Sequence, residues 1–238
     1  MLRIINTGLF YSLLSTWTMF WFIFCCVSLP LLPANRRHRV IVKPWCHTAL
    51  FLSKHLCGVN YQVIGAENIP DSPGVIISNH QSAWETFFLQ TIFTPQTQVI
   101  KRELLAIPFF GWTFRLLNPI AINRKDVRGS LKTIISKGTT LLQKGNWILI
   151  FPEGTRKPYG KLGKYSSGGA ALAINAAKQI VPVAHNAGKV WPSYQWLKNP
   201  GTITVVIGQP IDTTDKNHKQ LSNELHAWTE QQLADIDN

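Results

Sequence analysis

A histidine and a carboxylate stand five residues apart in the middle of the chain, a spacing that could support proton transfer. His80 follows an apolar run at residues 74–78, whose β-branched side chains predict a short buried strand. Ser82 and Glu85 form the capping-box pattern that begins a helix, so His80 falls in a tight strand-to-helix turn. A neutral imidazole in such a turn could accept a proton from a substrate, with Glu85 holding the ring.

A simpler interpretation of this stretch involves no chemistry. Glu85 could serve only as the capping partner of Ser82, and His80 could be an ordinary loop histidine. On one regular helix the two side chains would lie about 140° apart and could not meet. The catalytic interpretation therefore requires His80 to precede the helix, as the capping box predicts.

A second apolar run ends in a motif whose residue types suit an anion. Residues 146–151 predict another buried strand, which leads directly into Pro-Glu-Gly-Thr-Arg at residues 152–156. The planar guanidinium of Arg156 suits a phosphate, and Gly154 lets the backbone approach an anion closely. We expect Glu153 to hydrogen-bond a hydroxyl or to orient Arg156. The alternative is a surface turn with an exposed ion pair.

The two blocks together resemble those of the glycerolipid acyltransferase family, most closely the 1-acylglycerol-3-phosphate acyltransferases. That family carries N-H-x4-D followed by F-P-E-G-T-R, and the chain departs only at Glu85, where the family usually has Asp. Residues 181–183, Val-Pro-Val, resemble the fourth block of the family, and the proline is expected to be structural. The residues that resemble its second block are Lys101, Glu103, Leu104, Pro108, Gly111 and Arg124.

The resemblance implies an acyltransferase in which His80 and Glu85 are catalytic. The residues implied to bind substrate are Asn79, Lys101, Arg124, Glu153, Gly154, Thr155 and Arg156. His80 would act as base on an acceptor hydroxyl, and Glu85 would fix its tautomer and stabilise the imidazolium. No G-x-S-x-G motif is present, which favours direct transfer over an acyl-enzyme.

The expected reaction moves a fatty acyl group from acyl-CoA or acyl-carrier protein to 1-acylglycerol-3-phosphate, giving phosphatidate for phospholipid synthesis. A sister enzyme would use another acceptor, such as glycerol 3-phosphate, a lysophospholipid or an aminolipid. The change from Asp to Glu also leaves open a catalytically silent lipid-binding member of the same fold.

The N-terminal region is typical of a membrane anchor. Residues 4–35 contain no charged side chain, and a helix over residues 8–29 would be long enough to cross a hydrocarbon core of about 30 Å. The stretch is too long for a signal peptide, and no small-x-small site follows it. A second apolar helix, at residues 45–59, is expected to be interfacial, so whether the anchor spans the bilayer or dips into one leaflet stays open.

The charge on either side of this helix predicts its orientation. Four basic residues follow it and only one precedes it, which places the rest of the chain on the cytoplasmic face, that of the inner membrane if the source is bacterial. We therefore expect a membrane anchor at residues 1–60 and an acyltransferase domain at residues 61–238. The basic residues that follow the helix are Arg36, Arg37, Arg39 and Lys43.

Beyond the anchor, predicted strands alternate with predicted helices. This pattern predicts one α/β domain with a mixed, largely parallel sheet flanked by helices. Residues 101–164 hold thirteen Lys or Arg against three acids, out of a net charge of +12. An anionic substrate and an anionic leaflet explain that bias better than nucleic acid, for which no binding motif is present. The scattered histidines, the four cysteines and the lack of a glycine-rich nucleotide loop predict no metal site and no bound cofactor.

Overall fold

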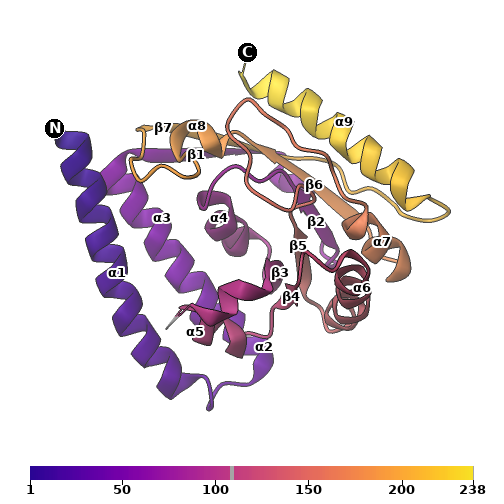
Figure 1. Cartoon of the computed structure of the whole chain (residues 1–238), viewed down its shortest axis with the longest axis horizontal. Coiled ribbons are helices and arrows are strands. Elements are labelled where there is room, and N and C mark those ends of the chain that lie inside the picture. Colours follow the sequence, from indigo (N-terminus) through magenta and orange to yellow (C-terminus); the bar gives the residue numbers. More distant parts are fainter. Residues whose placement is uncertain (108–109, 238) are drawn as a thin grey trace.

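The computed structural model describes residues 1–107 and 110–237 and shows one α/β domain preceded by a long apolar helix. A seven-stranded sheet in the order β1-β7-β6-β2-β5-β3-β4 forms its centre (Figure 1). All neighbouring strands are parallel except β6 and β7. The strands are β1 (Val59–Ile64), β2 (Val75–Ser78), β3 (Gln96–Lys101), β4 (Ile120–Ile122), β5 (Trp147–Ile150), β6 (Ile180–His185) and β7 (Gly201–Ile207).

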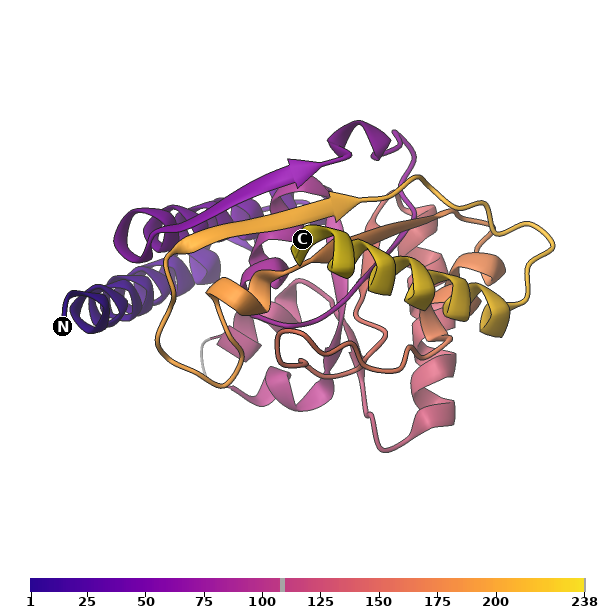
Figure 2. The ribbon, with the colours of Figure 1, turned by 90° about the horizontal axis from the view of Figure 1, so that it is seen from above.

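Helices cover both faces of the sheet. In Figure 1, α1, α3, α4 and α5 lie to the left of the sheet, and α6, α7 and α9 lie to the right. Figure 2 shows β1 and β7 running side by side at one edge. The helices are α1 (Leu2–Ser28), α2 (Ala34–Arg37), η1 (His38–Val42), α3 (Lys43–Cys57), η2 (Ala66–Asn68), α4 (Trp84–Ile92), η3 (Arg102–Ala106), α5 (Phe110–Leu116), α6 (Val127–Gln143), α7 (Gly168–Asn175), α8 (Ala187–Val190) and α9 (His218–Asp237).

The central strands explain why the sheet is buried on both faces. In β2, Ile76 packs into the core formed with α3 and α4, whereas Val75 and Ile77 pack into the core under α6, α7 and α9. All four residues of β2 and of β5 are buried. A strand covered on both sides needs apolar residues at every position, which is why these strands read as continuous apolar runs in the sequence.

The structure confirms the predicted fold class and corrects several boundaries. The first helix begins at Leu2, six residues before the predicted start at residue 8, and it ends one residue before the predicted residue 29. The second apolar helix spans Lys43–Cys57, and Val59 already belongs to β1. Pro108, one of the residues matched to the family's second block, lies outside the described residues.

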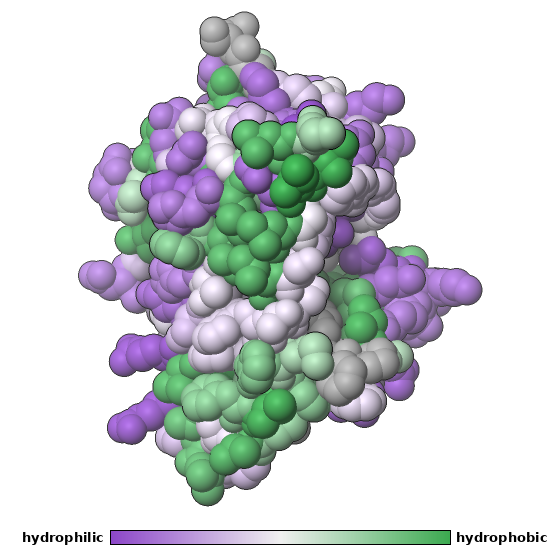
Figure 3. Space-filling view, turned by 90° about the vertical axis from the view of Figure 1, so that its left-hand side faces the viewer, coloured by the Kyte–Doolittle hydropathy of each residue, from purple (hydrophilic) through white to green (hydrophobic). Residues whose placement is uncertain are grey.

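The first helix, α1, is long and apolar enough to cross a membrane. It packs lengthwise against α3, yet many of its apolar side chains face outward, among them Leu2, Met19 and Phe20. The space-filling view of this side shows apolar surface with hydrophilic side chains to its left and right (Figure 3). Length and composition alone support this membrane assignment.

Parallel strand order places the chemistry-bearing residues at one edge of the sheet. Strands β6, β2, β5, β3 and β4 are neighbours with the same direction, so their carboxyl ends meet. The turn with His80 follows β2, residues 151–156 follow β5, and Arg124 follows β4. In α/β sheets this edge is where ligands generally bind.

Candidate active site

His80 lies in the turn between β2 and α4 and forms a short contact with Glu85. Its Nδ1 is 2.8 Å from the Glu85 Oε1 atom, and its ring stacks on Phe151 with a centroid separation of 4.0 Å. The helix begins at Trp84, two residues after the predicted start. His80 therefore precedes the helix, as the catalytic interpretation requires, and the imidazole can turn back to the carboxylate.

One oxygen of Glu85 performs both roles that the sequence allowed. Oε1 accepts hydrogen bonds from the backbone amides of Gln81, at 3.0 Å, and Ser82, at 2.7 Å, in addition to its contact with His80. The Ser82 hydroxyl in turn accepts from the amide of Trp84, so both halves of a capping box are present. Capping and pairing are thus not alternatives in this protein.

The surroundings of Glu85 favour its ionised form. The side chain is fully buried, and burial opposes the charge. The nearby rings of His185 and His80, together with the Ser82 amide, outweigh burial, so the pKa of Glu85 lies below its ordinary value. A carboxylate on Nδ1 places the proton of neutral His80 there, which leaves Nε2 with a lone pair for the substrate.

Glu153 braces the catalytic turn through the backbone. Its Oε1 accepts from the amide of His80 at 2.8 Å, and its Oε2 accepts from the amide of Gly163 at 2.8 Å. The amide of Lys157 donates to the carbonyl oxygen of His80 at 2.7 Å, so the segment after β5 holds that turn from two sides. Both carboxylate oxygens of Glu153 bind backbone amides, which corrects the expectation that this residue orients Arg156.

Two arginines share the site with His80. Arg124 and Arg156 line the same cavity, and neither forms a salt bridge with a carboxylate among the described residues. Burial lowers the pKa of Arg124, and the positive charge of Arg156 adds to that effect. The Nε atom of Arg156 is buried without a hydrogen-bond partner in the described part of the chain. Two close guanidinium groups have the charge and the planar geometry that suit a phosphate.

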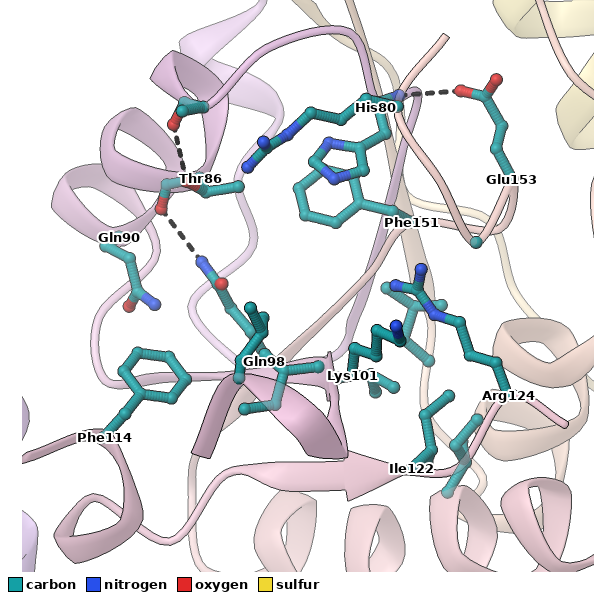
Figure 4. A pocket seen from close by; sticks show the side chains of 18 of the residues that line it. His80, Thr86, Gln90, Gln98, Lys101, Phe114, Ile122, Arg124, Phe151 and Glu153 are labelled. Atoms are coloured by element: carbon teal, nitrogen blue, oxygen red, sulfur yellow. Dashed lines mark hydrogen bonds between the residues drawn. The ribbon is translucent and has the colours of Figure 1, made fainter. Parts of the chain in front are cut away.

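The cavity that holds these groups is large and mostly apolar. It has a volume of about 780 Å³ and extends from His80 towards α1, α3 and α5 on one side and α6 on the other. Figure 4 shows Arg124 and Lys101 pointing into it on one side, with Gln90 and Phe114 on the other. Lys101 lies 3.5 Å from Glu103 in an exposed pair, so its charge is partly compensated. A cavity of this size suits a lipid chain.

Two of the predicted substrate-binding residues lie outside the cavity. Asn79 is fully buried, and its side-chain amide is used by β6: it donates to the His185 carbonyl at 2.9 Å and accepts from the His185 amide at 3.0 Å. Thr155 is exposed and does not line the cavity. Asn79 is therefore a residue that positions the turn, whereas Glu153, Gly154 and Arg156 line the cavity.

His185 is a buried residue of the site that the sequence analysis missed. Its Nε2 donates to the Asn79 carbonyl at 2.9 Å, and its Nδ1 accepts from the amide of Ala187 at 3.3 Å, which fixes its tautomer. Burial lowers the pKa of His185, whereas the nearby Glu85 carboxylate favours the charged ring. One signal in the sequence could have identified His185. It follows residues 180–183, and a strand that runs parallel beside β2 ends next to the turn that contains His80.

Gln81 joins the same turn to the segment after β6. Its side-chain oxygen accepts from the amide of Gly188 at 3.1 Å, and its carbonyl oxygen accepts from the Ser193 hydroxyl.

In the described part of the chain, no three His, Cys, Asp or Glu side chains gather as metal ligands. The arrangement supplies a histidine with its carboxylate partner, an apolar cavity and two guanidinium groups that form no salt bridge with the described residues.

Comparison with known proteins identifies relatives along almost the whole chain. The Acyltransferase family model matches residues 60–186, a span that contains the His80–Glu85 pair, Arg124 and Arg156. A 1-acyl-sn-glycerol-3-phosphate acyltransferase of Pseudomonas aeruginosa is 47% identical over 235 residues, which cover 98% of this chain and 91% of that protein. One of Saccharomyces cerevisiae is 33% identical over 166 residues, 67% of this chain and 54% of that protein.

A solved structure with a similar fold comes from Thermotoga maritima. The crystal structure of its 1-acyl-sn-glycerophosphate (LPA) acyltransferase, PlsC, superposes with a TM-score of 0.82 over 99% of this chain and 96% of that chain. The sequence identity is 21%, so this likeness supports the fold.

Proposed function

The chain belongs to the acyltransferase family and is an acyltransferase, and from that premise we propose that it acylates the free hydroxyl of 1-acylglycerol-3-phosphate to give phosphatidate. The acyl donor in this proposal is acyl-CoA or acyl-carrier protein. The observation that carries the proposal is a His80–Glu85 pair in the wall of an apolar cavity that also holds Arg124 and Arg156. With the activity class established, a catalytically silent member of the fold is no longer an alternative.

In the proposed mechanism, His80 is the base and no acyl-enzyme forms. The acceptor hydroxyl attacks the thioester carbonyl carbon while Nε2 of His80 takes the hydroxyl proton. Glu85 stabilises the imidazolium across the 2.8 Å contact and keeps the proton on Nδ1 in place. Collapse of the tetrahedral intermediate breaks the carbon–sulfur bond, and the leaving thiolate receives the proton from Nε2.

The rest of the cavity suits the two ends of the acceptor. Arg124 and Arg156 would bind its phosphate, with Lys101 as a third, more exposed cation. The apolar walls would hold acyl chains, because burying a methylene contributes about 0.8 kcal/mol. A phosphate held at one end and a chain at the other would leave the free hydroxyl as the group presented to His80.

We further propose that the protein works on a membrane. Residues 1–60 would attach it to the bilayer, and the acyltransferase domain would lie on the cytoplasmic face, that of the inner membrane in a bacterium. The length and apolar surface of α1 support attachment, and the basic residues that follow it support the orientation.

An acceptor panel tests the proposed substrate. Purified protein is given a radiolabelled acyl donor, either acyl-CoA or acyl-carrier protein, with lysophosphatidate, glycerol 3-phosphate, a lysophospholipid or an aminolipid. We expect phosphatidate as the main product. Efficient acylation of another acceptor, with little phosphatidate, would assign the chain to a sister activity.

Replacing Arg156 with Lys tests the phosphate site. Lysine keeps the charge but loses the planar fork, so we expect the acceptor KM to rise about tenfold and the donor KM to change by less than about twofold. Steady-state kinetics with each substrate varied in turn measures both constants. Arg115→Lys is the matched control, since Arg115 is exposed outside the cavity. A raised donor KM with an unchanged acceptor KM would move Arg156 to the donor site.

A further inference from the structure

The segment after α8, residues 191–198, packs on the first turns of α1. Trp191 contacts Phe10 edge to face with ring centroids 5.3 Å apart, and the amide of Lys198 donates to the Thr7 hydroxyl at 3.4 Å. Phe10 and Thr7 are both buried by this contact. The segment, called the aromatic loop below, is thus attached to the helix that is the candidate membrane anchor.

Two large aromatic side chains of the aromatic loop face solvent. Tyr194 is 84% exposed and Trp196 is 51% exposed. Tyr194 adopts a left-handed backbone conformation, with φ of 64°, that few non-glycine residues occupy. Exposed aromatic residues held in a strained loop suggest a binding role, because a purely structural loop would favour glycine and polar residues there.

The buried side chain of Lys198 stabilises the conformation of the aromatic loop. Its buried ammonium donates to the carbonyl oxygens of Gln195, at 3.1 Å, and Trp196, at 2.8 Å. The same ammonium lies 5.0 Å from the ring centroid of Tyr11 and 4.9 Å from that of Trp191. Burial lowers the pKa of Lys198 to about 8, which leaves it mostly protonated at neutral pH. The aromatic side chains are therefore presented by a fixed backbone.

The surroundings of the aromatic loop fit a lipid headgroup layer. On α1, the residues next to its attachment point include the exposed apolar side chains of Ile5 and Leu9. Tyr194 lines a cavity of about 300 Å³ together with Lys189, whose ammonium lies over the Tyr159 ring. Lys189 thus places a positive charge beside the aromatic loop, which complements anionic phospholipids.

We propose that the aromatic loop is a membrane-binding element, with Tyr194 and Trp196 seated at the headgroup level of an anionic bilayer beside α1. Tyrosine and tryptophan are the side chains that favour this layer, since each has an apolar ring and a polar end. The inference rests on the proposed membrane attachment of α1 and adds a second contact, from the catalytic half of the chain.

This contact would fix the height of the active site above the bilayer. The Ser193 hydroxyl donates to the carbonyl of Gln81, and the amide of Gly188 donates to its side chain, so the aromatic loop is bonded to the residue after His80. A loop seated in the headgroups would hold the catalytic turn at one distance from the layer that supplies a lipid acceptor.

Depth-dependent fluorescence quenching tests the proposal on the full chain. Cys26 is the exposed cysteine and is first replaced by alanine, because Cys25, Cys46 and Cys57 are buried. A thiol-reactive fluorophore is then attached through Tyr194→Cys, with Phe20→Cys on α1 and Glu230→Cys on α9 as references. The protein is reconstituted in phosphatidylcholine–phosphatidylglycerol vesicles that contain lipid brominated near its headgroup end.

We expect the label at position 194 to be quenched at least about threefold more than the label at position 230. Quenching at position 20 alone would overturn the proposal for the aromatic loop and leave membrane attachment by α1 standing. Absence of quenching at both positions 20 and 194 would overturn the attachment itself, and the inference with it.

A kinetic measurement gives an independent readout. Replacing both Tyr194 and Trp196 with Ser should raise the KM for a vesicle-embedded acceptor at least about threefold, with unchanged kinetics on a short-chain acceptor dissolved in water. An equal loss on both acceptors would show that the two residues act on folding or catalysis and would contradict the proposal.

Discussion

Replacing His80 with alanine should lower kcat by at least about 10²–10⁴-fold, the usual contribution of a general base. The variant loses the Nε2 lone pair that removes the acceptor proton, and the structure places no second imidazole on the described wall of the cavity. His185 cannot substitute, because its ring is fully buried and both of its nitrogens are bonded to backbone groups. Single-turnover and steady-state assays of purified protein measure the loss.

The fold should survive this change. The backbone amide and carbonyl of His80, which bind Glu153 and Lys157, are kept in the alanine variant. What is lost is the contact with Phe151 and one of three hydrogen bonds to Glu85. His218→Ala, at an exposed position, serves as control. A purified, folded variant with near wild-type turnover would rule out His80 as the base.

The strands were the part of the fold that the sequence predicted best. Continuous apolar runs such as residues 74–78 and 146–151 are typical of a strand buried on both faces, and the structure has β2 and β5 at these positions. Their parallel direction then brings His80, Arg124 and Arg156 to one edge without further information. The site could be predicted this far because it depends on strand order and on local motifs.

The sequence could not predict features that a contact between distant segments decides. The side-chain amide of Asn79, a residue expected to bind substrate, bonds to His185, more than a hundred residues away. The start of α1 was expected at residue 8, yet the helix begins at Leu2, and Thr7 is buried where its hydroxyl accepts from the amide of Lys198. Neither partner could be identified from a single sequence, because no local pattern records a pairing of this kind.

The glutamate at position 85 is accommodated by the position of the helix. Because α4 begins at Trp84, Glu85 lies in its first turn with its side chain directed back over the turn that contains His80. The longer side chain lets a single oxygen reach two backbone amides and the imidazole together. The departure from the family pattern thus keeps the pair that the chemistry needs.

Glu85→Gln should lower kcat by about 30-fold to 10²-fold. Two unit charges about 4 Å apart interact by about 4 kcal/mol at an effective dielectric constant of 20. The transition state carries part of the imidazolium charge, so losing the carboxylate charge should cost about 2–3 kcal/mol. The glutamine oxygen can still accept from Gln81 and Ser82, which fixes the amide orientation and keeps the His80 proton on Nδ1.

The stability of the Glu85→Gln variant reports on the capping role of Glu85, whereas its kcat reports on the catalytic role. The amide nitrogen of glutamine would replace Oε2, which is buried without a partner among the described residues, so two donors would be left unsatisfied. That cost is about 1–3 kcal/mol, and the lost charge also contributes stability at neutral pH, so we expect a net loss of at least about 1 kcal/mol. The measurement compares the kcat and the thermal midpoint of Glu85→Gln with those of the wild type.

The difference in stability between wild type and Glu85→Gln should change with pH in a definite direction. The folded-state pKa of Glu85 is lowered, so its charge contributes stability above the unfolded pKa of about 4.3, and this contribution is lost as the pH falls through the folded value. The stability gap between wild type and Glu85→Gln should therefore narrow below about pH 4. A gap that is constant with pH would mean that the pKa of Glu85 is the same in the folded and the unfolded protein.

Glu85→Asp provides the matched control, because it keeps the charge and shortens the side chain by one methylene. The shorter side chain cannot hold all three hydrogen bonds with the helix in its present place, so we expect activity between wild type and Glu85→Gln. If charge is what matters, the order of kcat is wild type, then Asp, then Gln. A glutamine variant with full kcat and a lowered midpoint would make Glu85 a cap alone and leave His80 without a catalytic partner.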